Sequence, residues 1–498
     1  MNALHELPAA IRVSRTDLIL ERALVNGSWV PAATGKTFAV TNPADGSLIA
    51  DVADCGAAEG KAAVDAAVAA FPAWRDRPAK ERSKLLRKWF ELIIANQEDL
   101  ARIISLEQGK PLAEARGEIA YGASYVEWFG EEAKRAYGTV IPEHVKGRKL
   151  VVLKEPVGVV AAITPWNFPM TMLARKIAPA LAAGCTVVAK PAEDTPLSAL
   201  ALAKLAEEAG IPPGCINIVP ASRGHAPDVV DTWLEDSRVR KLTFTGSTPV
   251  GKHLARESAG TLKKLSLELG GNAPFLVFDD ADLDQAVAGV LASKFRNTGQ
   301  TCVCAQRIYV QDGIYDAFAA KLVAAVEAMR MGPAASIDVE QGPLINARAV
   351  AKVEAHVADA IAGGARVLTG GKPHRLGGNF YEPTVLADVT PQMRVASEET
   401  FGPVAPLFRF RTEAEGVAAA NATPYGLAAY FYSRDVGRVW RVSQALEAGV
   451  IGANEGIVAT ELAPFGGVKE SGYGREGSLY GLDDYMHVKY VCMGGLAN

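Results

Sequence analysis

Residues 151–210 of this 498-residue chain read VVLKEPVGVVAAITPWNFPMTMLARKIAPALAAGCTVVAKPAEDTPLSALALAKLAEEAG. The apolar run 157–163 predicts a buried strand, and it ends in the polar-aromatic loop 164–169. A helical stretch follows and stops at Gly184, and the run 185–189 predicts a second strand. Two short strands joined through a helix are typical of a parallel sheet in an α/β protein.

The same alternation continues along the chain. Thr195 is expected to cap a helix that has Pro196 at its first position and Gly210 past its end. A strand at 241–245 then leads into a helix at 250–259. We therefore interpret the chain up to about residue 267 as an α/β domain of the nucleotide-binding type.

A second α/β run begins near Phe275 and includes a helix around 284–294. No Ser- or Pro-rich linker separates the two halves, so we expect a packed interface between them. The tail 484–491 alternates like a strand, and a terminal strand without a local partner often pairs with another subunit. The predicted parts are 1–267, 268–460, and 461–498, which returns to the first part and supplies the tail strand.

Composition excludes several classes of protein. The chain has 52 Lys and Arg against 56 Asp and Glu, and it shows no long basic stripe, so we expect no nucleic-acid partner. The longest clearly apolar run, 177–189, is 13 residues long, whereas a bilayer span needs roughly 20. The N-terminus interleaves charged residues and lacks the apolar core of a secretion signal, so we expect neither a membrane anchor nor export.

The six cysteines are irregularly spread and do not form a disulfide framework. A reducing cytoplasm is therefore the expected location, or the mitochondrial matrix if a leader was removed. Cys302 and Cys304 lie in the polar loop 297–304, where a thiol can meet a substrate. We expect no metal there, because C-x-C lacks a second pair and no His lies within forty residues. A catalytic thiol needs a lowered pKa or a nearby base, so the local sequence leaves the role of Cys302 open.

Two glycine-containing loops are candidates for binding a phosphate. The segment Gly472–Gly477 matches G-x-G-x-x-G, but no strand is predicted before it, so we interpret its glycines as turn residues. The loop 246–251 follows a predicted strand and opens a helix, where backbone N–H groups favour a phosphate. It has only two glycines, so a capped turn is an equal alternative.

Two acidic residues stand out by their position. Glu193 follows the predicted strand 185–189 together with Lys190, where it can hold ribose hydroxyls or form an ordinary solvated turn. A Glu at this point would repel a 2′-phosphate, which favours NAD over NADP. Glu268 lies in an apolar run closed by two glycines, and it fits either a buried general base or a residue at the edge of a strand.

Six motifs occur in the order and spacing of the aldehyde dehydrogenase superfamily, which the chain resembles over nearly its whole length. They are TPWNFP (164–169), KPAE (190–193), FTGS (244–247), ELGG (268–271), GQTC (299–302) and ETFGP (399–403). The chain is most similar to the succinate-semialdehyde dehydrogenases, through 294–304 and 464–469. The resemblance implies an aldehyde dehydrogenase-like α/β fold, with a Rossmann-type cofactor domain, an α/β catalytic domain and a small β element for oligomerisation.

The resemblance also implies a reaction, the NAD(P)-dependent oxidation of succinate semialdehyde to succinate. Cys302 would attack the aldehyde to give a thiohemiacetal, while the Asn167 amide holds the oxyanion. Glu268 would activate the water that hydrolyses the later thioester. The alternatives are another ω-carboxy aldehyde such as glutarate semialdehyde, a broad range of aldehydes, or a catalytically idle binding protein.

Eleven residues match the positions that bind the cofactor in the superfamily, where NAD is expected and NADP is an alternative. They are Trp166, Lys190, Pro191, Ala192, Glu193, Gly246, Ser247, Thr248, Gly251, Glu399 and Phe401.

Arg175 and Arg296 match the positions that grip the distal carboxylate of the substrate in the succinate-semialdehyde dehydrogenases, a task that suits the guanidinium fork. Ala459 stands where these relatives place a Ser, which leaves room for a longer substrate. Cys304 resembles a second cysteine that closes a reversible disulfide to the nucleophile in some relatives. A hairpin around 137–154 and the tail strand would assemble a homodimer or homotetramer.

Overall fold

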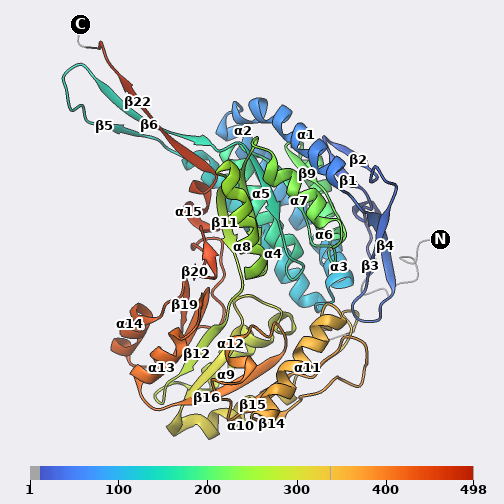
Figure 1. Ribbon diagram of the computed structural model, residues 1–498, viewed down its shortest axis with the longest axis vertical. Helices are drawn as coiled ribbons and strands as arrows, with labels where there is room; N and C mark the ends of the chain where they lie inside the picture. The colour runs from blue at the N-terminus through green and yellow to red at the C-terminus, as the bar shows by residue number, and fades with distance from the viewer. Residues whose placement is uncertain (1–11, 337, 497–498) are drawn as a thin grey trace.

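The computed structural model describes residues 12–336 and 338–496, which form two large sheets covered by helices (Figure 1). The strands of the first sheet, in spatial order, are β2 (Ser28–Val30), β1 (Ala23–Val25), β9 (Ile216–Ile218), β8 (Thr186–Lys190), β7 (Val159–Ile163), β10 (Val239–Thr245), β11 (Lys264–Glu268) and β21 (Gly472–Tyr473). Its helices are α1 (Ala57–Arg75), α2 (Ala79–Ala95), α3 (Gln97–Gln108), α4 (Leu112–Glu132), α5 (Pro169–Ala183), α6 (Leu197–Ala209), α7 (Ala226–Glu235), α8 (Thr248–Ser258) and α15 (Ser478–Asp483).

The second sheet comes from the later part of the chain. In spatial order its strands are β14 (Arg366–Thr369), β15 (Thr384–Ala387), β16 (Val404–Phe410), β13 (Ala305–Gln311), β12 (Ala273–Val277), β18 (Ala428–Tyr432) and β19 (Val450–Ala453). Its helices are α9 (Leu283–Val290), α10 (Tyr315–Glu327), α11 (Ala347–Ala362), α12 (Arg394–Ser397), α13 (Glu413–Asn421) and α14 (Val436–Ala445). The chain changes sheet between β11 and β12, close to the expected boundary.

The centre of the first sheet is parallel, from β9 through β8, β7 and β10 to β11. The chain runs outward from β7 through β8 to β9 and then returns to the other side of β7 with β10. The order of strands therefore reverses between β7 and β10, and in open α/β sheets ligands bind at the carboxyl ends of strands beside such a switch.

Helix α5 follows β7 and is buried along its whole length. It is apolar on nearly every side because it packs against the sheet on one side and against α4 on the other. Gly184, with φ +99°, ends the helix as the sequence predicts, whereas Pro169, which the sequence analysis placed in the loop, is its first residue.

The predicted capping of the next helix is wrong. Helix α6 begins at Leu197, and no side chain of the preceding turn caps it. The carboxyl group of Glu107, at the end of α3, instead accepts hydrogen bonds from the backbone N–H groups of Leu197 and Ser198, both at 2.8 Å. The Thr195 hydroxyl turns away toward the carbonyl of Trp166, at 3.5 Å. A group from a distant helix therefore replaces the local cap.

The tail strand has a partner within its own chain, contrary to the sequence-based expectation. Strand β22 (Met486–Met493) pairs antiparallel with all of β6 (Lys149–Pro156), which also pairs with β5 (Thr139–Ile141). The three strands form an arm that projects away from both large sheets (Figure 1). The sequence did not reveal this pairing because more than 300 residues separate the two strands.

None of the helices formed by the described residues combines the length and apolar character that a bilayer crossing requires.

Replacing Glu107 by Ala would remove the cap of α6. Two buried N–H groups would lose their acceptor, so we expect a loss of stability of about 3 kcal/mol. The thermal midpoint of unfolding should fall by several degrees, and Glu107→Gln, which keeps one acceptor oxygen, should fall less. Equal midpoints for Glu107→Ala and the wild type would contradict this account.

Candidate active site

The loops that end three neighbouring parallel strands meet at one edge of the first sheet. β7 leads into the loop 164–168, β8 ends at Lys190, and β10 leads into Gly246 and the start of α8. The residues that the sequence places at strand ends therefore lie at the switch point between β7 and β10.

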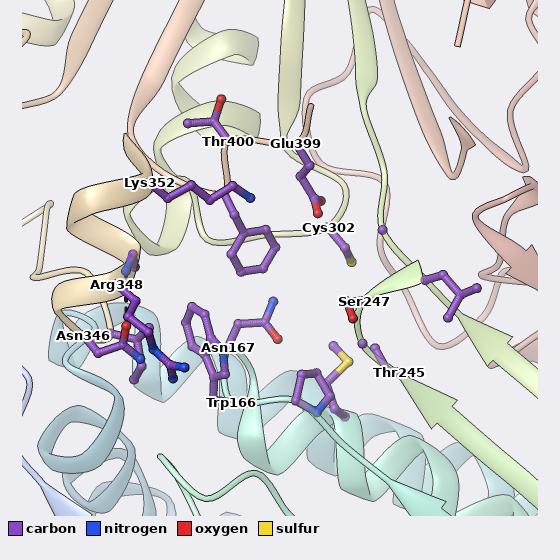
Figure 2. Close-up of a pocket in the computed structure, with 18 of the residues that line it drawn as sticks. Trp166, Asn167, Thr245, Ser247, Cys302, Asn346, Arg348, Lys352, Glu399 and Thr400 are labelled. Carbon is purple, nitrogen blue, oxygen red and sulfur yellow. Dashed lines mark hydrogen bonds between the residues drawn. The ribbon is translucent and has the colours of Figure 1, made fainter. Parts of the chain in front are cut away.

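A cavity of about 420 Å³ opens at this edge and is closed on its other side by the second half of the chain (Figure 2). Seven of the predicted site residues line it: Trp166, Asn167, Gly246, Ser247, Cys302, Glu399 and Phe401. The structure thus brings together side chains that are more than 230 residues apart in the sequence.

Cys302 lies in a strained loop. The helix that begins as α9 changes to a π-helical turn over Leu291–Phe295, and the chain then passes through Asn297 (φ +51°) and Thr298 (φ +56°). Left-handed residues other than glycine cost free energy and persist only where surrounding contacts impose them. Here those contacts direct the Cys302 thiol into the cavity (Figure 2).

Asn167 faces Cys302 from the first sheet and is held at several atoms. Its side-chain Nδ2 donates to the carbonyl of Gln300 at 3.0 Å. Its own carbonyl accepts from Asn297 Nδ2 at 2.9 Å and from the buried ammonium of Lys110 at 2.8 Å. An amide donor is therefore fixed beside the loop that carries the thiol.

The thiol of Cys302 is protonated at neutral pH. Burial raises its pKa to about 12, although the positive charge of Arg175 opposes this shift. A thiol attacks a carbonyl only as it loses its proton, so the site needs a base within reach.

Glu268 is a candidate for this base. It ends β11, is 2% exposed, and neither carboxyl oxygen has a hydrogen-bond partner among the described residues. Burial and then the charge of Glu476 raise its pKa well above the ordinary value. The charge of Glu268 also contributes to the raised pKa of Cys302, so the titrations of these two groups are linked.

The start of α8 fits a phosphate. Ser247 is the N-cap of the helix, yet its side chain makes no capping hydrogen bond, and Gly246 and Ser247 line the cavity. A Cβ on Gly246 would come within 2.4 Å of the Phe244 ring, and one on Gly251 within 2.3 Å of Leu269. The glycines therefore keep the turn close to the sheet and leave N–H groups available to an anion.

Lys190 ends β8 and Glu193 follows it, and neither is among the residues that line the 420 Å³ cavity, although Glu193 lines an adjoining one. Glu193 Oε2 is 3.7 Å from the Lys190 ammonium, and its Oε1 accepts a hydrogen bond from Arg223 Nε at 3.0 Å. Pro191 and Ala192 form the buried turn between the two charged residues. Despite burial, the charges of Lys190 and Arg223 lower the pKa of Glu193, so it is an anion at neutral pH.

Glu399 and Phe401 come from the second half of the chain. Glu399 Oε1 accepts from the N–H of Gly271 at 3.3 Å, and burial raises its pKa to about 7. The Phe401 ring contacts the Trp166 ring edge-on, with centroids 5.5 Å apart, and its backbone has φ +57°. Both aromatic residues line the cavity.

The two arginines that are predicted to bind the substrate differ in burial and in ion pairing. Arg175 is 1% exposed, ion-paired with Glu476 and stacked on the Phe465 ring at 4.5 Å. Its Nη2 is buried and has no hydrogen-bond partner among the described residues. Arg296 is half-buried over the Phe168 ring at 5.0 Å, and within the described chain it makes no ion pair.

Tyr121 links these two arginines. Burial raises its pKa, and the charges of both Arg175 and Arg296 oppose that shift, which places both guanidinium groups within electrostatic range of one phenol.

Ala459 is half-buried after β19, and the hydroxyl of the adjacent Thr460 bonds to Glu461 at 3.3 Å. The Thr460 hydroxyl is therefore already hydrogen-bonded within the protein.

Cys304 is buried, and its sulfur contacts three polar groups. Its sulfur accepts from Gln306 Nε2 at 3.0 Å, lies 3.6 Å from the ammonium of Lys294, and donates to the carbonyl of Gly299 at 3.3 Å. These contacts would have to break before Cys304 could join Cys302.

Several residues of the cavity were not predicted from the sequence. They include Arg223, Asn346, Arg348, Lys352 and Thr400. Three of them come from α11 and the residue before it, a segment with no motif, so only the packing of the two halves reveals them. Gly472, by contrast, lies in β21, where a Cβ would come within 1.9 Å of the Leu267 carbonyl, and its segment is no phosphate loop.

The described residues contain no group of three or more His, Cys, Asp or Glu side chains placed to hold a metal ion.

The family follows from comparison with known proteins. Residues 29–491 match the model of the aldehyde dehydrogenase family, and the chain belongs to that family. The resemblance seen in the six motifs and the expected α/β fold are thereby confirmed.

Relatives at high identity extend over nearly the full length. The chain is 58% identical to a glutarate-semialdehyde dehydrogenase of Pseudomonas aeruginosa, over 96% of this chain and 99% of the relative. It is 57% identical to an NADP(+) succinate-semialdehyde dehydrogenase of Escherichia coli, over 97% and 100%. The crystal structure of a succinate-semialdehyde dehydrogenase from Burkholderia pseudomallei superposes with a TM-score of 0.95, at 56% identity, over 97% of this chain and 99% of that one.

The raised pKa of Cys302 predicts how its reactivity depends on pH. Inactivation by iodoacetamide should accelerate about tenfold per pH unit from pH 7 to pH 10, because the thiolate fraction keeps growing below a pKa of about 12. An ordinary thiol levels off near pH 8.5 to 9. A plateau in the inactivation rate of the free enzyme below pH 9 would refute this description of the site.

Proposed function

We propose that this aldehyde dehydrogenase oxidises succinate semialdehyde to succinate with NAD(P), by way of a covalent intermediate on Cys302. The observation that carries the proposal is the cavity in which Cys302 faces the amide of Asn167 beside an uncapped helix start. Glutarate semialdehyde is the second candidate, favoured by Ala459, whose small side chain leaves room for one more methylene.

The chain's own residues account for the first step. The Cys302 sulfur attacks the aldehyde carbon, and the carbonyl oxygen gains negative charge as the thiohemiacetal forms. Asn167 Nδ2 and the backbone N–H of Cys302 donate to that oxygen. Because burial keeps the thiol protonated, a base must accept its proton. The charges of Glu399 and Glu268 both act on Cys302, and of these two Glu268 is the one whose carboxyl oxygens have no hydrogen-bond partner among the described residues.

The cofactor supplies one thing, an acceptor at its nicotinamide for the hydride that leaves the thiohemiacetal carbon. The N–H groups at the start of α8 would hold its pyrophosphate, with Thr248 and Gly251 in the first turns. Lys190 and Glu193 would hold the adenosine ribose, and Glu399 the nicotinamide ribose beside Phe401. The fit rests on the open helix start and on the absence of Cβ atoms at Gly246 and Gly251.

Hydrolysis then releases the acid. Once Glu268 has passed the proton from Cys302 to solvent, its carboxylate draws a proton from a water molecule. That water attacks the thioester carbon, and the carbon–sulfur bond breaks to free the carboxylic acid and the Cys302 thiolate. A carboxyl group with a raised pKa suits this task, because it is a stronger base than an exposed carboxylate.

The distal carboxylate of the substrate would lie between Arg296 and Arg175. Arg296 makes no ion pair among the described residues, and Nη2 of Arg175 is a buried donor without a partner there. A carboxylate in this position would satisfy both.

The wider organisation is part of the same proposal. We assign 1–267 to the cofactor domain, 268–460 to the catalytic domain, and 461–498 to a return into the first sheet and the arm. The arm exposes apolar side chains on β5, β6 and β22, which supports assembly into a homodimer or homotetramer. We place the enzyme in the cytoplasm, or in a mitochondrial matrix if a leader was removed.

Substrate preference tests the role of Arg296. Formation of NAD(P)H should be measured with succinic semialdehyde, glutaric semialdehyde and uncharged butanal. We expect the carboxylate aldehydes to have the higher kcat/KM in the wild type, and Arg296→Ala to lose about a hundredfold for them with little change for butanal.

Comparison of kcat/KM for succinic and glutaric semialdehyde then identifies the better substrate. Arg411→Ala serves as the matched control and should behave like the wild type, because this arginine lies just after β16, is 83% exposed and pairs only with Asp312 among the described residues. If the wild type has the same kcat/KM for butanal as for the semialdehydes, Arg175 and Arg296 have only a structural role. The proposal is then reduced to the oxidation of aldehydes in general.

Reversible oxidation tests the role of Cys304. We expect hydrogen peroxide to inactivate the enzyme and dithiothreitol to restore it, because a Cys302–Cys304 disulfide protects the nucleophile from further oxidation. In Cys304→Ala the inactivation should become irreversible. Equal recovery of the wild type and the variant would exclude the disulfide.

A further inference from the structure

Arg223 is a charged residue of the cofactor cleft that the reaction above does not use. It lies in the loop between β9 and α7, and its side chain is 61% exposed. Its Nε donates to Glu193 Oε1 at 3.0 Å, and this is the only hydrogen bond it makes within the described chain. The rest of its guanidinium fork therefore faces solvent beside the residue expected to hold the ribose.

A second cavity, of about 310 Å³, adjoins the first at this point. Arg223, Ile345 and Asn346 line both cavities, so the arginine stands at the passage between them. The wall of the second cavity also contains Ser222 and the acidic side chains of Glu107, Glu193 and Asp194. A group attached to the ribose near Glu193 would enter this polar space.

The charges at this end of the cleft are of both signs. Lys190, Arg223 and Arg348 are cationic, and the carboxylates of Glu193 and Asp194 face them. Burial and then Glu193 raise the pKa of Asp194, while the charges of Arg223 and Arg348 act to lower it. Both arginines therefore lie within electrostatic range of this acidic pair.

We propose that Arg223 is the residue that admits the 2′-phosphate of NADP, and that it does so by exchanging its ion pair with Glu193 for a paired contact to the phosphate. With NAD, Arg223 stays on Glu193 and neutralises the carboxylate that holds the ribose hydroxyls. With NADP, the guanidinium turns to the phosphate and cancels the repulsion that Glu193 alone would exert. This inference rests on the NAD(P) site of the proposed function.

The proposal corrects the expectation drawn from Glu193 alone. The sequence places Glu193 near the ribose but does not show that Arg223, thirty residues later, pairs with it. When Arg223 turns to the phosphate, the Lys190 ammonium, 3.7 Å from Glu193 Oε2, still offsets part of the repulsion between Glu193 and the phosphate.

Binding of two adenosine probes to the full chain tests the proposal without turnover. Adenosine 2′,5′-bisphosphate carries the extra phosphate and adenosine 5′-monophosphate lacks it, and calorimetry gives the Kd of each. We expect Arg223→Ala to weaken binding of the bisphosphate about tenfold and of the monophosphate less than about twofold. The ratio of kcat/KM for NADP to that for NAD should fall by a similar factor.

Two further variants separate a specific contact from a change in net charge. Arg411→Ala removes the same charge from an exposed site just after β16 and should leave both Kd values unchanged. Glu193→Gln should strengthen binding of the bisphosphate when Arg223 is present, because it frees the guanidinium and removes the repulsion.

The outcomes distinguish this inference from the proposed function. If Arg223→Ala weakens both probes by the same factor, or neither, the role of Arg223 in selecting the phosphate is overturned while the adenosine site stands. If neither probe binds the wild type, the proposed NAD(P) site and the inference both fail.

Discussion

The hydrogen bonds between Asn167 and the loop 297–300 join the two sheets of the protein at the point where Cys302 lies. Asn167 belongs to the first sheet, and its amide and carbonyl bond to Gln300 and Asn297 of the second half. The ammonium of Lys110 adds a buried charge-assisted bond to the same carbonyl. The thiol and the amide that faces it are thus held in register by contacts that exist only when the halves are packed.

Buried charge is the second constraint on the site. Arg175 and Lys176 pair with Glu476 behind the cavity, and Glu268 lies beside them without a hydrogen-bond partner among the described residues. Removing these groups from water is costly, and their mutual attraction offsets part of that cost. The carboxyl group of Glu268 is left with a high proton affinity, which is the property that a general base requires.

Much of this arrangement could be predicted from the sequence, and the errors have clear causes. The strand ends at β7, β8 and β10 were predictable because apolar runs and glycines are local signals. The cap of α6 was assigned to the wrong residue because the real cap, Glu107, comes from another helix. The tail strand was left unpaired because its partner, β6, is more than 300 residues away.

The sequence by itself determined the fold class, the six motifs and the family, because each depends on residue types at short spacing or on their order along the chain. The tertiary structure alone decided which charges share a site. It paired Arg223 with Glu193, Arg175 with Glu476 and Lys294 with Cys304, and it added α11 to the cleft. The physical reason is that electrostatic and hydrogen-bond energies depend on distances of a few ångströms, which sequence separation does not specify.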